Sequence, residues 1–417
     1  MRILSVTAQK PHSTGSGVYL TGLVNSFSQM GHEQAVIAGV YREDEVCFPR
    51  EVEFCPVYFR TEELPFAITG MSDEMPYEST RYRDMTPEMT EQFFQAFGKR
   101  VTETVERFQP DIILCHHLYL LTALVRKLCP DCRVEGICHG SDLRQIKQNG
   151  LFREEIIREI QKLDGIWALH REQKEQIEEI FSCREGQVQV LGTGYDGRIF
   201  SCTKERTERE AGRRKGRKDL RLAFAGKISE KKGVKSLLRA MDYLDWPEGE
   251  VSLTLAGGWG QEEEHREIER LAGACRYPVE FAGRLAQPEL AALLNTRDVF
   301  VLPSFYEGLP LSVIEALACG CRVVCTDLPG IRPWLEENVP GHGVEFVSPP
   351  RMRNEDEPEG EDLPGFERAL ADAIVRAAEK TGNREKLARS LEKVSWDGIA
   401  GKVLKGRAEQ LTTAVRP

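Results

Sequence analysis

The sequence predicts an α/β protein of two domains, each built on a mostly parallel β-sheet. Short apolar or β-branched segments alternate with amphipathic segments over most of the 417 residues, as repeated strand–helix units do. The chain is also too long for one ordinary core, because a domain commonly holds about 100–200 residues. A polar stretch rich in Lys and Arg, residues 201–219, interrupts the alternation. We therefore expect a domain boundary there.

The first half of the chain is predicted to form six strands and three helices, which define an N-terminal domain over residues 1–200. The expected strands are residues 2–8, 34–39, 111–115, 133–138, 165–169 and 187–191. Helices are expected at residues 17–30, 87–108 and 171–181, where apolar residues recur three or four positions apart.

The second half repeats the pattern after the predicted linker, residues 201–219. A membrane or nucleic-acid patch is the alternative for the linker, but interleaved glutamates dilute its positive charge. The expected strands are residues 220–226, 251–256, 279–282, 299–303, 322–326 and 344–347. They place a C-terminal domain at residues 220–394, followed at 395–417 by a helix that packs on a domain surface. Residues 65–86 and the acidic, Pro-rich residues 349–365 are expected to be loops.

Composition excludes some functions. A net charge of -10 argues against sequence-independent nucleic-acid binding, which needs clustered cations. The first residues show no signal-peptide pattern, and no apolar run reaches the length of about 18 residues that spans a membrane. A cytoplasmic protein is expected, with membrane association not indicated. The twelve cysteines are expected to be reduced, and Cys129 and Cys132 lack the partners of a zinc site.

The segment from Pro303 to Pro329 carries the strongest functional signal. It follows a predicted strand, and ligands of open parallel sheets bind beyond the carboxyl ends of strands. Gly308 permits close backbone approach, and Pro310 suits the first position of a helix whose free amides favour an anionic phosphate. Glu307 and Glu315 offer carboxylates for sugar and ribose hydroxyls, although the two glutamates taken alone favour a helix cap at Glu307 and a solvated side chain at Glu315.

The string PSFYEGLPLSVIEALACGCRVV in this segment closely resembles the donor-binding signature of family 4 glycosyltransferases. The resemblance covers the two glutamates, Gly308, Leu309 and the glycine before the next strand. It implies the GT-B fold, in which two Rossmann-like domains face a central cleft, with the nucleotide-sugar donor on the C-terminal domain and the acceptor on the N-terminal one.

Two lysines match the loop that binds the donor diphosphate in this family. Lys232 stands at the family's lysine, whereas Lys227 stands where an arginine is usual. Both ammonium groups can neutralise a diphosphate leaving group, but lysine lacks the bidentate fork of arginine. Surface charge at a strand end is the alternative explanation.

Further loops resemble the family in order and spacing. Gly258 lies in a second glycine turn, and Arg284 and Leu285 lie in a loop that contacts the nucleobase in the family. Near the N-terminus, Gly15, Ser16 and Gly17 form a short glycine loop, which we assign to the acceptor side, with Gly17 reaching the donor. This loop lacks the full dinucleotide fingerprint, which argues against NAD.

His139 and Asp142 belong to the stretch His-Gly-Ser-Asp, which resembles a His-Gly-Thr-Asp stretch of the family. The resemblance implies that His139 lies beside the reacting sugar and that Asp142 lies on the acceptor side. A lone histidine at a strand end is more often structural, but its neighbours favour the site.

Together the resemblances imply a retaining hexosyl- or N-acetylhexosaminyltransferase that uses a nucleoside diphosphate sugar, expected to be a UDP-sugar, as co-substrate and no cofactor. His139, Lys232 and Glu307 are the predicted catalytic residues. The absence of an Asp-x-Asp sequence fits metal independence. The alternatives are an inverting enzyme with His12 as base, a UDP-sugar epimerase or hydrolase, and a non-catalytic nucleotide-sugar-binding subunit. The acceptor is left open among glycans, lipid-linked and small molecules.

Overall fold

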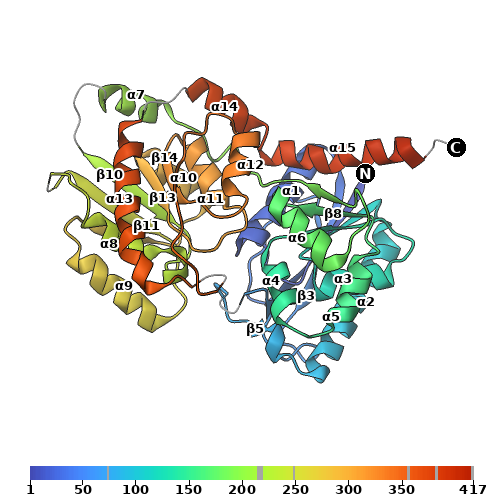
Figure 1. Ribbon diagram of the computed structural model, residues 1–417. Helices are drawn as coiled ribbons and strands as arrows, with labels where there is room; N and C mark the ends of the chain where they lie inside the picture. Colours follow the sequence, from blue (N-terminus) through green and yellow to red (C-terminus); the bar gives the residue numbers. More distant parts are fainter. Residues whose placement is uncertain (73–74, 214–218, 248, 355–356, 381–383, 415–417) are drawn as a thin grey trace. The chain divides into compact units, whose positions relative to one another are not determined.

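The structure is a computed structural model that describes residues 1–72, 75–213, 219–247, 249–354, 357–380 and 384–414. It divides into two compact units (Figure 1). The first unit comprises Met1–Gly194 and Trp396–Pro417, and the second comprises Tyr195–Ser395. The predicted boundary at residue 200 falls a few residues later than this division.

The first unit is built on a seven-stranded sheet in the order β3-β2-β1-β6-β7-β8-β9, and every pairing is parallel. Its strands are β1 (Arg2–Thr7), β2 (Glu33–Val40), β3 (Glu53–Tyr58), β6 (Ile112–His116), β7 (Val134–Ile137), β8 (Gly165–Ala168) and β9 (Val188–Val190). A separate parallel pair joins β4 (Thr69–Gly70) and β5 (Thr80–Arg81) within the predicted loop 65–86, whose residues 73–74 lie outside the described residues.

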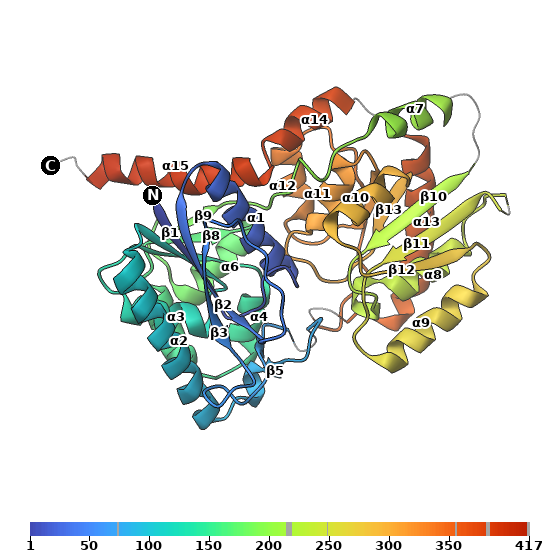
Figure 2. The ribbon, with the colours of Figure 1, turned by 180° about the vertical axis from the view of Figure 1, so that it is seen from behind.

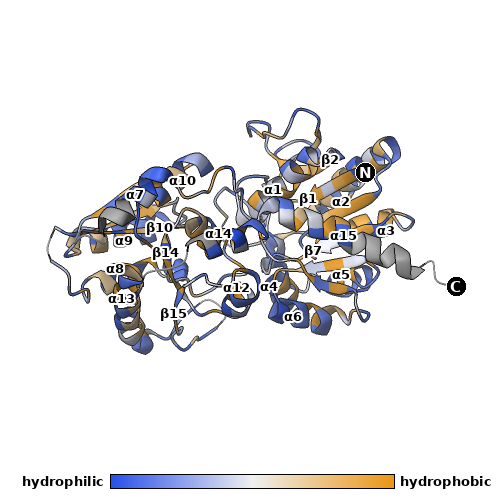
Figure 3. Cartoon of the chain, turned by 90° about the horizontal axis from the view of Figure 1, so that it is seen from above, coloured by the Kyte–Doolittle hydropathy of each residue, from blue (hydrophilic) through white to orange (hydrophobic). Residues whose placement is uncertain are grey.

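The helices of the first unit flank this sheet (Figure 2). They are α1 (Gly15–Gln29), the short 3-10 helix η1 (Tyr82–Asp84), α2 (Pro87–Phe108), α3 (Leu120–Leu128), α4 (Ser141–Gln148), α5 (Arg153–Ile160), α6 (Arg171–Phe181) and α15 (Trp396–Ala414). Hydropathy follows this layering, since β1 is coloured hydrophobic and α6 mainly hydrophilic (Figure 3). One buried cluster joins α2 and α3 to the strands, and a smaller one joins α1 to β2.

Helix α15 packs against α1 of the first unit. The ring of Trp396 fills a slot lined by two glycines, since a Cβ atom would lie 2.4 Å from this ring at Gly22 and 2.6 Å from it at Gly194. Tyr19 contacts the same ring edge-on, with centroids 4.9 Å apart, and Ser26 Oγ donates a 2.7 Å hydrogen bond to Asp397. Helix α15, near the C-terminal end of the described chain, thus forms part of the same domain as the N-terminal helix α1.

The second unit holds a parallel six-stranded sheet in the order β12-β11-β10-β13-β14-β15. Its strands are β10 (Leu220–Ala225), β11 (Val251–Ala256), β12 (Val279–Gly283), β13 (Val299–Leu302), β14 (Arg322–Thr326) and β15 (Glu345–Val347). Its helices are α7 (Lys204–Arg213), η2 (Glu230–Lys232), α8 (Val234–Met241), α9 (Glu262–Ala274), α10 (Gln287–Asn295), α11 (Leu311–Ala318), α12 (Ile331–Asn338), η3 (Gly360–Asp362), α13 (Leu363–Glu379) and α14 (Arg384–Glu392).

The predicted linker at residues 201–219 contains a helix, because Lys204–Arg213 form α7. Lys, Arg and Glu have high helix propensity, so a polar stretch of these residues can be helical. The buried guanidinium of Arg206 anchors α7 by donating a 2.8 Å hydrogen bond to the Gly320 carbonyl. Residues 214–218 of the predicted linker, and 355–356 of the predicted loop 349–365, lie outside the described residues.

Among the described residues, no helix is both long and apolar enough to cross a membrane. The same part of the chain contains no group of His, Cys, Asp and Glu side chains that could hold a metal ion.

Candidate functional site

Most of the predicted donor residues lie on loops that follow four neighbouring strands of the second unit, whereas Glu315 lies on helix α11 and Gly17 lies on α1 of the first unit. Strands β12, β11, β10 and β13 are adjacent in that order, and all are parallel. Their carboxyl ends therefore meet at one edge of the sheet, where ligands of such sheets bind. The loop after β10 carries Lys227 and Lys232, and the loop after β13 carries Glu307 and Gly308.

Lys232 and Glu307 form the centre of this group. Lys232 Nζ lies 2.7 Å from Glu307 Oε1 and 3.4 Å from the Tyr306 carbonyl oxygen. Ser304 Oγ donates a 2.8 Å hydrogen bond to the same carboxylate oxygen. The side chains of Lys232 and Glu307 keep 29% and 15% of their surface exposed. Solvent, and hence a ligand, can therefore reach the Lys232 ammonium group and the Glu307 carboxylate, which already hold each other in place.

Gly233 brings the two loops together. Its φ of +69° is left-handed, and a Cβ atom at this position would lie 2.0 Å from the Pro303 carbonyl oxygen. Behind it, the Phe305 amide donates a 3.0 Å hydrogen bond to the Lys231 carbonyl. Only glycine allows this approach, and the approach sets Lys232 against Glu307.

We expect Gly233→Ala to destabilise the second unit far more than Gly249→Ala. Both glycines have a left-handed φ, but nothing lies within 4 Å of a Cβ atom at Gly249. The Gly249→Ala variant should therefore lose about 1 kcal/mol from backbone strain alone, whereas Gly233→Ala adds a backbone clash. Thermal unfolding of both variants measures the difference. Equal losses of Tm would contradict the close approach at Gly233.

The second glycine turn joins the loops after β10, β11 and β12. A Cβ atom at Gly257, where φ is +150°, would lie 1.7 Å from the Gly226 carbonyl oxygen, and one at Gly258 would lie 2.3 Å from Arg284 Nε. The Ile228 amide donates a 2.8 Å hydrogen bond to the Gly258 carbonyl. Gly258 and Arg284 are thus in contact at the carboxyl edge of the second sheet. The Arg284 side chain is exposed, and Leu285 is half-buried.

Trp259 follows this turn and is a candidate that the sequence analysis did not single out. Its ring stacks on His265 at a centroid distance of 3.8 Å and an angle of 2°, yet 42% of its surface is exposed. The visible signal was a tryptophan within a glycine-rich turn at a strand end.

Glu315 lies within the second unit rather than on its surface. Helix α11 begins at Leu311, with Pro310 as its extended N-cap residue instead of its first residue, so Glu315 lies about one turn into the helix. Glu315 is only 7% exposed, and burial raises its pKa to about 7. The alternative of a solvated side chain was therefore wrong: residues 313–317 are all buried, so α11 has no polar face there.

In the first unit, the predicted acceptor-side residues Gly15, Ser16 and Gly17 are the first three residues of helix α1 rather than a loop, and Thr14 caps that helix. Thr14 Oγ1 accepts a 3.1 Å hydrogen bond from the Gly17 amide and lies 3.0 Å from Ser16 Oγ. A Cβ atom at Gly17 would lie 2.7 Å from the Lys10 carbonyl oxygen, whereas Gly15 has free space around it. His12 Nδ1 lies 3.1 Å from Thr21 Oγ1, and burial lowers the pKa of His12.

His139 and Asp142 also lie together, after strand β7. The Asp142 carboxylate accepts hydrogen bonds from the His139 amide at 3.2 Å and from the Leu118 amide at 2.8 Å. Asp142 is fully buried, so it connects the loops after β6 and β7 and has no access to solvent. Its geometry is that of a structural anchor beneath His139.

The structure also brings two histidines to His139 that the sequence analysis did not select. His116 Nδ1 lies 3.1 Å from His139 Nε2, and the ring of His117 lies 4.7 Å from that of His139. The sequence signal was a pair of histidines directly after the strand predicted at residues 111–115.

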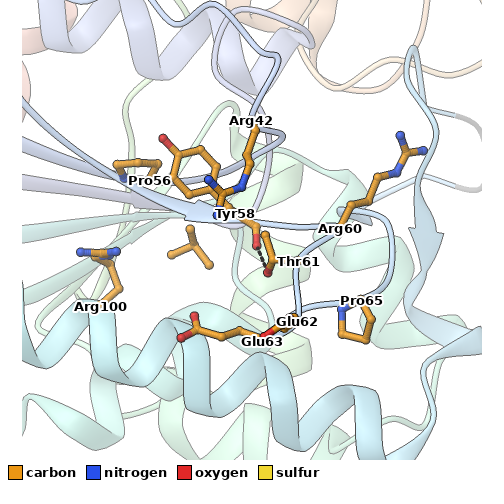
Figure 4. Close-up of a pocket in the computed structure, with 10 residues that line it drawn as sticks. Arg42, Pro56, Tyr58, Arg60, Thr61, Glu62, Glu63, Pro65 and Arg100 are labelled. Carbon is orange, nitrogen blue, oxygen red and sulfur yellow. Dashed lines mark hydrogen bonds between the residues drawn. The ribbon is translucent and has the colours of Figure 1, made fainter.

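A hollow of the first unit lies apart from both histidines, beside β3 and the loop after it (Figure 4). Its volume is about 910 Å³, and Arg42, Tyr58, Glu63 and Arg100 are among its lining residues. None of the predicted site residues line it. The predicted residues therefore form two groups, one in each unit: the lysine–glutamate group at the edge of the second sheet and the histidine group at the edge of the first.

Two Rossmann-like units, each built on a parallel sheet, match the GT-B fold that the sequence predicts. Residues 205–352 match the family of glycosyl transferases group 1. This part of the chain belongs to that family, which confirms the resemblance seen in the sequence, and the chain is accordingly classed as a glycosyltransferase.

Particular relatives support the same class. An uncharacterized glycosyltransferase of Methanocaldococcus jannaschii is 25% identical over 307 residues, which cover 70% of this chain and 73% of that protein. The sucrose-phosphate synthase of Thermosynechococcus elongatus has a similar structure, with a TM-score of 0.68, 18% identity and coverage of 99% of this chain and 100% of that one. The Anabaena protein HepE, solved with UDP and glucose, gives a TM-score of 0.66 at 14% identity, with coverage of 98% and 100%. Several other curated relatives match over less than half of their length.

Proposed function

We propose that this protein is a retaining family 4 glycosyltransferase that moves a hexosyl or N-acetylhexosaminyl group from a UDP-sugar to an acceptor hydroxyl. The observation that carries the proposal is the Lys232–Glu307 pair, held 2.7 Å apart at the carboxyl edge of the second sheet. It combines a cation for a diphosphate with a carboxylate for sugar hydroxyls. The complex of HepE with UDP and glucose supports the choice of nucleotide.

In the proposed reaction the bond between the anomeric carbon and the diphosphate oxygen breaks, and the acceptor oxygen bonds to the same face of that carbon. The acceptor proton passes to the departing diphosphate oxygen, so the reaction needs no protein nucleophile and no outside base. Lys227, Lys232 and the amides before α11 stabilise the charge that develops on the diphosphate. This stabilisation acts mainly in the transition state and therefore raises kcat.

The remaining residues bind and orient the two substrates. Glu307 accepts hydrogen bonds from hydroxyls of the donor sugar, and Glu315 accepts them from the ribose. Gly258, Gly308 and Leu309 let the backbone approach the donor, and Arg284 and Leu285 contact the base. In the first unit His139 contacts the reacting sugar, while Gly15, Ser16 and Gly17 line the path of the acceptor and of the diphosphate.

A panel of nucleotide sugars tests the proposal. UDP-, GDP- and ADP-linked hexoses and UDP-N-acetylhexosamines are incubated with wild type, Glu307→Ala and Glu263→Ala, and release of nucleoside diphosphate is measured. Glu263 is an exposed glutamate in the first turn of α9 and serves as the matched control. We expect one UDP-sugar to be turned over, a loss of about 10²-fold or more for Glu307→Ala, and no loss for the control.

Other outcomes decide between functions. If no donor in the panel shows turnover that depends on Glu307, the proposed transferase activity is refuted. Tight binding of UDP without turnover of any donor would favour a non-catalytic binding subunit. An epimer formed without acceptor would indicate an epimerase. Anomeric NMR of the product separates retention from inversion by His12.

A further inference from the structure

Three imidazoles meet at the ends of two adjacent strands in the first unit, and only one of them has a role in the proposed reaction. His116 is the last residue of β6, His117 follows it, and His139 comes two residues after β7. His116 Nδ1 and His139 Nε2 are 3.1 Å apart, and the two rings are within 10° of parallel. One nitrogen of His139 is therefore already engaged, and only Nδ1 remains to meet a substrate.

The surroundings fix this arrangement. The Asp142 carboxylate accepts from both the Leu118 and His139 amides, so it ties the loop after β6 to the loop after β7. The Tyr19 ring packs edge-on against His139 at 5.2 Å, and the Tyr19 hydroxyl donates to the Gly192 carbonyl at 3.0 Å. His117 is held at a left-handed φ of +73° between these contacts.

Both histidines of the pair are uncharged near neutral pH. Burial lowers the pKa of His116 to about 3, and burial and the neighbouring imidazoles keep the pKa of His139 well below its usual value. The charged groups near the cluster do not reverse this, because Asp142 acts mainly on His117, whose pKa is also lowered by burial. Two neutral imidazoles share one proton across the 3.1 Å contact.

The unused nitrogen of His116 decides which ring donates that proton. His116 Nε2 is buried and has no hydrogen-bond partner among the described residues. If His139 were the donor, this Nε2 would carry a buried, unpaired N–H. If His116 is the donor, the same Nε2 is a bare acceptor. Orphaned buried N–H groups are the rarer of the two in proteins, so donation from His116 is favoured.

We propose that His116 is a positioning residue that donates its Nδ1–H to His139 Nε2 and so holds His139 with its own proton on Nδ1, as a hydrogen-bond donor to the substrate. The role of that donor rests on the proposed function: a fixed N–H can bind a hydroxyl oxygen of the reacting sugar without first reorienting. The histidine tautomer itself does not depend on any activity.

Histidine-selective ¹⁵N labelling and NMR of the full chain near pH 7.5 test the tautomer directly. We expect His139 to carry its proton on Nδ1 in wild type and to shift toward the Nε2–H form in His116→Leu, which has no donor. In His116→Asn the amide N–H can take the place of the imidazole Nδ1–H, so the Nδ1–H form of His139 should persist. His170→Asn changes only a helix cap in the same unit and serves as the control.

Turnover provides the second readout. His116→Leu should lower kcat by about 10- to 100-fold, the value of one to two hydrogen bonds, with less than a threefold change in donor KM, and His116→Asn should restore most of it. An Nε2–H tautomer of His139 in wild type, or an unchanged tautomer in His116→Leu, would overturn the proposal. If His116→Leu does not fold, a wild-type Nε2–H signal or loss of the Nδ1–H form in His116→Asn still overturns it. Failure of every donor refutes the proposed function and leaves the tautomer result standing.

Discussion

Lys232→Ala is expected to lower kcat/KM by about a thousandfold, the largest single loss in this chain. The ammonium group loses its place beside the leaving diphosphate, where a preorganised charge is worth about 3–4 kcal/mol in the transition state. The variant also leaves Glu307, only 15% exposed, without the cation that lies 2.7 Å from it. Most of the loss should fall on kcat, because the charge that Lys232 meets grows as the bond breaks.

Steady-state kinetics of nucleoside diphosphate release, with the donor found in the panel, measure this effect. Lys231→Ala is the matched control, because Lys231 is the preceding residue of η2 and holds Phe305 through its backbone carbonyl, which the substitution retains. Lys232→Arg should recover part of kcat by restoring the charge. A loss confined to KM, or equal losses at positions 231 and 232, would contradict the assignment of Lys232 to the leaving group.

Glu315→Gln is expected to stabilise the protein above neutral pH and to weaken nucleotide binding. Burial raises the pKa of Glu315 from 4.5 to about 7. Between these values the folded state binds more protons than the unfolded state, so stability falls as pH rises from 4.5 to 7 and then levels off. The cost of the ionised carboxyl above pH 7 is about 3 kcal/mol, and a neutral glutamine amide avoids much of it.

Thermal unfolding between pH 4.5 and 8.5 measures this difference. The Tm of Glu315→Gln should exceed that of wild type at pH 8, and the two should converge near pH 4.5. Affinity for UDP should fall about tenfold, since a carboxylate is a stronger acceptor for ribose hydroxyls than an amide oxygen. Glu336→Gln, an exposed glutamate on α12, should show neither change. Parallel Tm curves for Glu315→Gln and wild type would show that folding does not raise the pKa of this carboxyl.

The sequence predicted the elements whose ends carry local signals. Helix α2 was predicted to the residue, because Thr86 caps its start, Pro87 is its first residue and Gln109 ends it in a left-handed conformation. Strand β3 was missed, because Pro56 and Glu53 make its six residues resemble a loop. Helix α3 was missed as well, since its nine residues are largely apolar and too few to distinguish a buried helix from a buried strand.

In the candidate site, too, patterns of neighbouring residues could be predicted, whereas contacts between residues far apart in the sequence could not. Strand ends and glycine turns are local patterns, so the loops could be located from the sequence. The contact of Lys232 with Glu307 joins residues 75 positions apart, and that of His116 with His139 joins residues 23 apart. Such contacts depend on strand order and side-chain direction, which a single sequence does not encode locally. The burial of Glu315 was misjudged for a related reason, because helix α11 is covered on more than one face.

The slot that Gly22 and Gly194 form for Trp396 has a consequence for biosynthesis. During translation the first unit is synthesised some two hundred residues before the tryptophan that fills it. Until residue 396 and the turns after it have left the ribosome, α1 lacks a neighbour, and an apolar surface beside Tyr19 stays uncovered. A fragment ending at residue 194 would keep that surface permanently. The first unit is therefore one compact domain made of two separate segments of the chain, and it cannot be completed until the second segment has been synthesised.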